Sequence, residues 1–391
     1  MKSEDVELYG LKDLWLRILF LKYSLTIFLI SFFITEALNK VFKYENSYFF
    51  LAPILKTLVL IYAFTQIFKY PKKVKEVLIL VIFFIIGQLF LDERFDKMIL
   101  INTAKYLFLI VLVIYVNKNR PSEKALKRLF LVFEYIMILN SVLIIIGLLF
   151  NVFYFKTYYG IRPGYNGFLI TSATSTYVYM IVLFYFYLKY KSKFIFKLKP
   201  QLIIISSFII GTKGAVIALI GILLLYVFQQ EKKSHKLLAI AIIAIASSIG
   251  LYFILFKTNL LTKIYYRYDI LTAFLSYRNK LLMEKMIPFI KENWSLGNYL
   301  FGGINSISTR SQMGFFDVFY FFGSIGSIYY IYVLIKNYLM FQINKINSLF
   351  LVLILLLIFL SGNFFLNASV VIYVLILRES MVYYNDKTIQ K

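Results

Sequence analysis

Residues 118–153 have the sequence KNRPSEKALKR-LFLVFEYIMILNSVLIIIGLLFNVF, in which a short basic turn is followed by a long apolar segment. An apolar segment of this length is sufficient to cross the hydrocarbon core of a bilayer as an α-helix. The same alternation recurs along the 391-residue chain, which is 61% hydrophobic. It predicts an all-α integral membrane protein, because a backbone exposed to lipid must satisfy its own hydrogen bonds.

Working outward from this segment, we expect about twelve transmembrane helices in a single polytopic membrane domain, residues 1–391. Residues 200–229 form either one bent helix or two helices broken at Gly211-Thr212-Lys213-Gly214. The predicted spans are 15–35, 48–68, 76–91, 98–116, 129–153, 167–188, 200–211, 214–229, 237–256, 314–335, 348–361 and 364–378.

The net charge of +24 comes from 43 basic and 19 acidic residues. In a soluble protein this excess would indicate nucleic-acid binding. Here the lysines lie in turns between apolar segments, as the positive-inside rule describes, so no nucleic-acid partner is expected. Twelve spans place the five basic turns on one side, which predicts that both termini are cytoplasmic. These turns are 69–75, 118–128, 189–199, 232–236 and 336–345.

The chain has no cysteine and one histidine, which excludes a disulfide, a thiol nucleophile and a metal site built from Cys and His. Its carboxylates are too scattered along the sequence to predict a metal cluster. We therefore expect no metal and no cofactor.

One polar segment, residues 257–313, is much longer than the other turns, and the charge pattern places it on the extracytoplasmic side. Within it, residues 277–290 show helical spacing of apolar side chains, which predicts a short amphipathic helix at the membrane interface. Its basic face suits either a lipid-linked phosphate or ordinary anionic headgroups. Five aromatic residues of the loop are candidates for stacking on sugars or for anchoring at the interface: Tyr265, Tyr266, Tyr268, Trp294 and Tyr299.

Basic residues combine with backbone-breaking residues at several places on the predicted outer side. Arg162 and Gly164 belong to a Gly- and Pro-rich turn, and an arginine fork matches the geometry of phosphate. Lys213 interrupts apolar sequence, where it must snorkel or pair with an anion. Arg278 lies in the long loop. Asp317, close to apolar sequence, is either a functional acid or the partner of a nearby cation.

Taken together, these positions describe an outward cavity with several cations and few anions. Such a cavity suits a phosphorylated substrate carried on a lipid.

The order of these motifs resembles the Wzy-type O-antigen and capsular polysaccharide polymerases, within the O-antigen polymerase and ligase superfamily. The resemblance covers most of residues 130–378. It rests on Arg162-Pro163-Gly164, Gly211-Thr212-Lys213-Gly214, Arg278, Leu300-Phe301-Gly302-Gly303 and the pair Gly323 and Gly326.

The resemblance implies a metal-independent glycosyltransferase of the bacterial cytoplasmic membrane. Such enzymes move a glycan from a polyprenyl diphosphate carrier to a sugar hydroxyl at the outer face. Arg162 and Arg278 would bind the diphosphate, and Lys213 stands where the family more often has Arg. Gly302 and Gly303 match its Gly-rich turn. The implied partners are a polyprenyl-diphosphate-linked oligosaccharide and membrane lipid, with a flippase and a chain-length regulator left open.

The chain departs from the family at the expected catalytic position. Where ligases tend to have His and many polymerases Glu, this sequence has Gln312, and a glutamine cannot act as a general base. Either Asp317 supplies that role or the base lies elsewhere.

Three alternatives stay open at this point. A ligase would transfer finished glycan to another acceptor by the same chemistry. A flippase or other transporter would show repeated halves, and no internal repeat is obvious. An assembly protein without catalysis would tolerate replacement of Arg162 and Arg278.

Overall fold

The computed structural model describes residues 4–47, 49–91, 97–158, 162–228 and 259–389, together with isolated positions between 236 and 252. Throughout these residues the protein is helical, apart from turns and one isolated antiparallel bridge between Lys156 and Tyr165. This confirms the all-helical prediction. Four helical segments are long and apolar enough to cross a membrane: Tyr23–Tyr44, Met98–Lys118, Glu123–Phe150 and Gly314–Tyr338.

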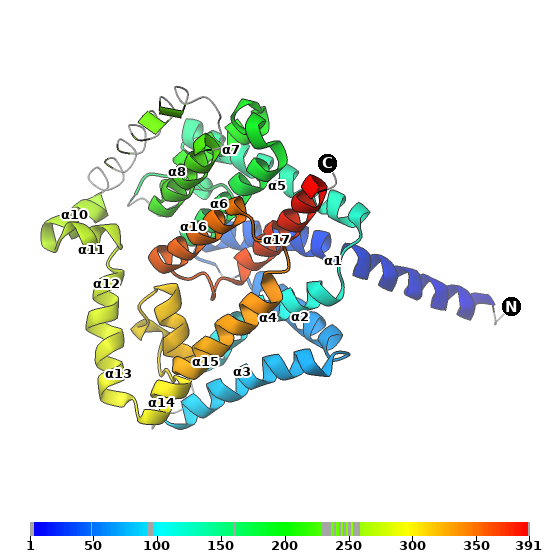
Figure 1. Cartoon of the computed structure of the whole chain (residues 1–391), viewed down its shortest axis with the longest axis horizontal. Helices are drawn as coiled ribbons and strands as arrows, with labels where there is room; N and C mark the ends of the chain where they lie inside the picture. Colours follow the sequence, from blue (N-terminus) through cyan, green and yellow to red (C-terminus); the bar gives the residue numbers. More distant parts are fainter. Residues whose placement is uncertain are drawn as a thin grey trace.

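Each predicted span except 237–256 overlaps one described helix, although α1 and α17 extend well beyond the spans predicted for them, and 237–256 lies mostly outside the described residues (Figure 1). The agreement follows from the length of the apolar runs and the basic turns that end them. The helices are α1 (Glu4–Tyr44), α2 (Leu51–Ile67), α3 (Pro71–Leu89), α4 (Lys97–Lys118), α5 (Glu123–Phe150), α6 (Ser172–Tyr190), α7 (Leu198–Ile209), α8 (Lys213–Phe228), α15 (Gly314–Tyr338), α16 (Lys345–Ser361) and α17 (Ala368–Ile389).

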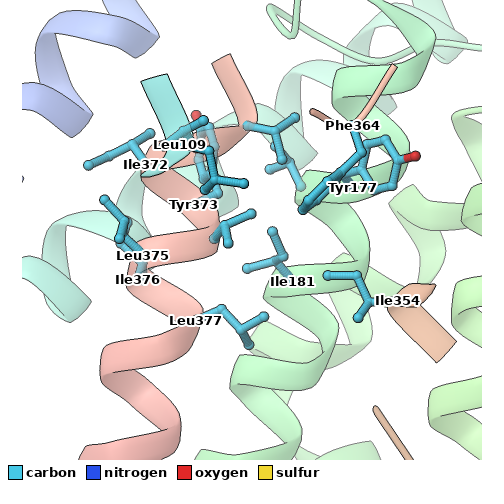
Figure 2. Close-up of a cluster of buried hydrophobic side chains, with 14 of the residues drawn as sticks. Leu109, Tyr177, Ile181, Ile354, Phe364, Ile372, Tyr373, Leu375, Ile376 and Leu377 are labelled. Carbon is cyan, nitrogen blue, oxygen red and sulfur yellow. The ribbon is translucent and has the colours of Figure 1, made fainter. Parts of the chain in front are cut away.

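Helix α6 lies at the centre of the bundle and packs against α7, α8 and α17. All of its residues from 174 to 188 are buried, which requires an apolar surface on every side. Figure 2 shows Tyr177 and Ile181 of α6 in one cluster with Ile376 and Leu377 of α17. Lipid tails are as apolar as these side chains, so close packing between helices stabilises this centre.

The segment 200–229 forms two helices, which settles the alternative left open by the sequence. Helix α7 ends at Ile209 and α8 begins at Lys213. Between them Gly211 adopts a φ of +72°, a conformation that an L side chain rarely takes. The Thr212 hydroxyl accepts a hydrogen bond from the Ala215 amide at 3.2 Å and caps the start of α8.

The described part of the long polar loop consists of short helices. They are α10 (Asn259–Arg267), α11 (Ile270–Phe274), α12 (Arg278–Leu281), α13 (Ile287–Asn293) and α14 (Leu296–Phe301). A π-helical turn, Leu282–Met286, joins α12 to α13, so the helix predicted over 277–290 is present. Pro288 has no amide hydrogen to donate, which accounts for the widened turn before it.

Candidate functional site

A cavity of about 220 Å³ lies where the start of α6, the α7–α8 turn, the α11–α12 turn and the end of α16 meet. Its walls include Arg162, Lys213, Arg278 and Gln312, which come from four separate stretches of the chain. None of the described residues that line it carries a carboxylate. The structure therefore brings the three predicted cations and Gln312 together around one hollow without acidic side chains.

The turn that carries Arg162 packs directly on the α7–α8 turn. The Tyr165 amide donates a hydrogen bond to the Ile209 carbonyl at 3.0 Å. A Cβ added to Gly164, which has a φ of +135°, would lie 2.3 Å from the Ile210 carbonyl oxygen. Only glycine permits this approach, and it holds the Arg162 turn against the Lys213 turn.

Lys213 is the first residue of α8, where unpaired backbone amides and the helix dipole already favour an anion. Its Nζ donates hydrogen bonds to the carbonyls of Ala273 (2.7 Å) and Phe274 (2.5 Å), at the end of α11. An anion entering the cavity would compete with these carbonyls for the ammonium group.

Arg278 also lines the cavity, and among the described residues its guanidinium has one hydrogen-bond acceptor, the Leu360 carbonyl at 2.8 Å from Nη1. Its Nε is buried and has no hydrogen-bond partner among the described residues. Burial lowers the pKa of the guanidinium from its usual value, although an arginine stays protonated in proteins. Ser276 and Tyr277, just before it, have φ values of 54° and 69°, conformations that cost energy and are imposed by their surroundings.

Arg162 is half-buried, and its guanidinium carbon lies 5.1 Å from the centroid of the Tyr158 ring. No described side chain forms an ion pair with Arg162, Lys213 or Arg278 at this cavity. The three cations thus retain donors that neutral carbonyls and rings satisfy only in part.

No protein-family model, curated protein or solved structure matches this chain.

Gln312 lies at the cavity wall with a φ of +60°, a conformation held by Asp317 behind it. One carboxylate oxygen of Asp317, Oδ1, accepts hydrogen bonds from the backbone amide of Gln312 at 3.1 Å and from the Ser311 hydroxyl at 2.8 Å. Asp317 is 1% exposed and does not line the cavity. Its Oδ2 has no hydrogen-bond partner among the described residues and lies 3.9 Å from Arg310 Nη1.

The Gly-rich turn lies away from the cavity. A Cβ on Gly302 would meet the Phe321 carbonyl oxygen at 2.4 Å, and one on Gly303 would meet the Gly87 carbonyl oxygen at 2.8 Å. Trp294 is also buried there, and its Nε1 donates a hydrogen bond to the Gly303 carbonyl at 2.9 Å. This turn packs the loop against α3 and α15, and it does not line the cavity.

The structure adds lining residues that the sequence motifs did not identify, among them Tyr158, Thr176 and Ser276. The Thr176 hydroxyl lies 2.9 Å from that of Thr212. Hydroxyl groups of this kind suit the polar oxygens of a phosphate or a sugar. The sequence did not indicate them because only the packing of α6 brings Thr176 to the cavity. Among the described residues, no group of three or more His, Cys, Asp or Glu side chains gathers as a metal site would require.

Proposed function

We propose that the protein is a membrane glycosyltransferase that polymerises polyprenyl-diphosphate-linked oligosaccharide repeat units at the outer face of the bacterial cytoplasmic membrane. The convergence of Arg162, Lys213 and Arg278 on one cavity without described carboxylates supports this proposal most strongly. The family resemblance suggests the reaction class, and the cationic cavity favours a diphosphate as its ligand.

Three cations in a half-buried hollow match a diphosphate in charge. Hydrogen bonds between charged groups are about twice as strong as neutral ones, and low local polarity strengthens them further. During transfer, the bond between the sugar C1 and the diphosphate oxygen breaks, and a bond from C1 to the acceptor oxygen forms. Negative charge then grows on the diphosphate, where Arg162 and Arg278 stabilise it.

The acceptor hydroxyl loses its proton as the new bond forms. In this proposal Gln312 orients the acceptor hydroxyl from the cavity wall, and the proton passes to an oxygen of the departing diphosphate, whose negative charge grows as the sugar leaves. Asp317 acts here as a positioning residue, because its Oδ1 accepts the hydrogen bond of the Gln312 backbone amide and its carboxylate does not line the cavity.

The arrangement of the helices supports an outward-facing site. The cavity lies where α6 and α8 begin, whereas the basic residues Lys189 and Lys199 lie at the other ends of α6 and α7. Helix α6 has 19 residues, which at about 1.5 Å each gives about 28 Å, close to the thickness of a bilayer core. If the lysine-rich end is cytoplasmic, the cavity is extracytoplasmic.

The glycan profile of cells that lack the protein tests this function, by gel and by mass spectrometry of lipid-linked material. Single repeat units that accumulate in the outer leaflet would support a polymerase. Full-length glycan left on its lipid carrier would indicate a ligase instead. Single units trapped on the cytoplasmic side would indicate a flippase and would contradict the proposal.

A further inference from the structure

The end of helix α11 forms part of the cavity wall, and one of the three cavity cations holds this helix in place. We propose that α11 is a movable wall that the ligand itself releases. Lys213 keeps the wall closed in the empty protein, and a bound diphosphate competes for Lys213 and frees the helix. This inference rests on the proposed function, because it concerns access to the site assigned to the lipid-linked substrate.

Lys213 joins the start of α8 to the end of α11. Two of the three donors of its Nζ are taken by the Ala273 carbonyl at 2.7 Å and the Phe274 carbonyl at 2.5 Å. Both carbonyls lie in the last turn of α11, where a cation also interacts favourably with the helix dipole. Diphosphate oxygens carry negative charge that these carbonyls lack, so they are the stronger acceptors for the same ammonium group.

Helix α11 is short and depends on contacts outside itself. It has five residues, too few for a helix to be stable in water on its own, and Leu271 is 58% exposed. The Thr272 hydroxyl accepts a hydrogen bond from the Asn279 side chain at 2.7 Å, which ties α11 to α12. Because α12 carries Arg278, helix α11 connects two of the cavity cations, and its release would affect both.

The turn between α11 and α12 is strained in the closed state. Ser276 and Tyr277 follow one another with φ values of 54° and 69°, which costs energy unless the surroundings impose it. The Tyr277 amide donates a hydrogen bond to the Thr272 carbonyl at 3.0 Å, so the position of α11 helps to impose this turn. Relaxation of the turn therefore favours opening once a ligand occupies Lys213.

The size of the closed cavity gives a reason for a movable wall. Its volume is about 220 Å³, whereas sites that hold a drug-sized ligand measure roughly 300–1,000 Å³. A sugar and its diphosphate need more room than the closed cavity provides. Since Phe274 and Ser276 line the cavity, movement of α11 and the turn that follows it would enlarge the site.

The first test follows the position of α11 in the full-length protein, in phosphatidylcholine nanodiscs, by spin-label spectroscopy. The chain has no cysteine, so Leu271→Cys provides a single labelling position on an exposed part of α11. We expect inorganic pyrophosphate to make this label more mobile. Lys213→Met keeps the length of the side chain but removes its donors, so it should give the mobile spectrum without pyrophosphate.

The second test is a calorimetric titration of Asn279→Ala with pyrophosphate. This variant removes a contact of α11 and leaves every residue that lines the cavity unchanged. It should raise the affinity for pyrophosphate about fivefold, the effect of one lost hydrogen bond on the closed state with which the ligand competes. A residue that only supported the site would lower the affinity instead, so the direction of the change identifies the movable wall.

Asn293→Ala is the matched control, because it removes a hydrogen bond to the Phe289 carbonyl within α13 of the same loop. It should change neither the affinity nor the label. Pyrophosphate that binds without changing the label, or an Asn279→Ala variant that binds no more tightly, would overturn the inference and leave the proposed function standing. A label that is already mobile in the empty protein would also overturn it. Absence of pyrophosphate binding would contradict both the inference and the proposed function.

Discussion

The cations at the end of the bundle away from the cavity differ from the three cations that line the cavity. At the end away from the cavity, Glu134 of α5 forms ion pairs with Lys189 and with Lys199 (2.9 Å), and it accepts a hydrogen bond from Tyr185 at 2.7 Å. Glu76 of α3 similarly lies 3.0 Å from Lys336 of α15. Each buried carboxylate joins neighbouring helices through the cations around it.

At the cavity end, Arg162, Lys213 and Arg278 have no such partner among the described residues, and neutral carbonyls or rings occupy them instead. A cation with a carboxylate partner therefore occupies a structural position, whereas a cation without one is available to bind a ligand. Composition alone does not show this difference, because both ends are rich in the same residue types.

The largest expected effect is the loss of polymer when the unpaired arginines are removed. Arg278→Ala and Arg162→Ala should each lower polymer formation about 1,000-fold, because each removes a donor aimed at the developing charge. Arg278→Lys should rescue poorly, since a point charge does not replace a planar fork. Gel analysis of glycan from complemented deletion cells measures this, with membrane insertion confirmed by blotting.

Lys336→Ala is the control for these two variants, because it removes a cation that is paired with a carboxylate, Glu76, at the end of the bundle away from the cavity. It should leave polymer close to normal. Near-normal polymer from both arginine variants would remove the basis for the site.

The second effect concerns the stability of the protein and the ion pairs at the end of the bundle away from the cavity. Glu134→Gln should destabilise the protein by about 1 kcal/mol, because the half-exposed Lys189 and Lys199 lose their counter-charge. Denaturant unfolding in detergent measures the change. Pyrophosphate affinity of the folded fraction should stay the same, and a loss of affinity would show that the two ends are not independent.

The third effect tests how the cavity is assembled. Gly164→Ala should weaken pyrophosphate binding about tenfold, because the added Cβ would displace the Arg162 turn from the Ile210 carbonyl. Gly221→Ala is the matched control. It adds the same methyl group inside α8, where the nearest atoms belong to the flexible end of Leu353. Equal binding by the two variants would contradict the role given to the packed turns.

The smallest effect is local and depends on pH. Asp269 caps α11, and hydrogen bonds from Thr272, that of its backbone amide first, hold the pKa of this carboxyl below its usual value. Because the pKa of Asp269 is lower in the folded protein, the ionised carboxylate stabilises α11 at every pH above its ordinary pKa of about 3.9. This stabilisation is lost as the pH falls through the lower, folded-state pKa. Amide exchange at Thr272, corrected for its intrinsic rate, should rise only at that acidic limit. Asp269→Asn should abolish this pH dependence while keeping a cap.

Much of the fold follows from local sequence, because apolar length and basic turns determine where a membrane helix begins and ends. The break at Gly211 and the grouping of Arg162, Lys213 and Arg278 agree with the motifs as well. The positions of Gly302 and Gly303 do not follow from their motif, since they depend on contacts with α3 and α15. The number of membrane crossings and the orientation of the chain stay predictions.

The environment of Asp317 also could not be inferred from the sequence. Its position near Gln312 along the chain was evident, but the direction of each carboxylate oxygen depends on the left-handed turn at Gln312. Spacing along a helix predicts which residues share a face, but it does not predict which neighbouring helix that face meets.

The most direct test of the central claim is reconstitution of the purified protein with a chemically defined polyprenyl-diphosphate-linked repeat unit, followed by mass spectrometry of the lipid products. Our account predicts lipid-linked chains of two or more units, one free polyprenyl diphosphate released for each bond formed, and no product from Arg278→Ala. Single repeat units that stay unchanged in the presence of the folded protein would contradict it.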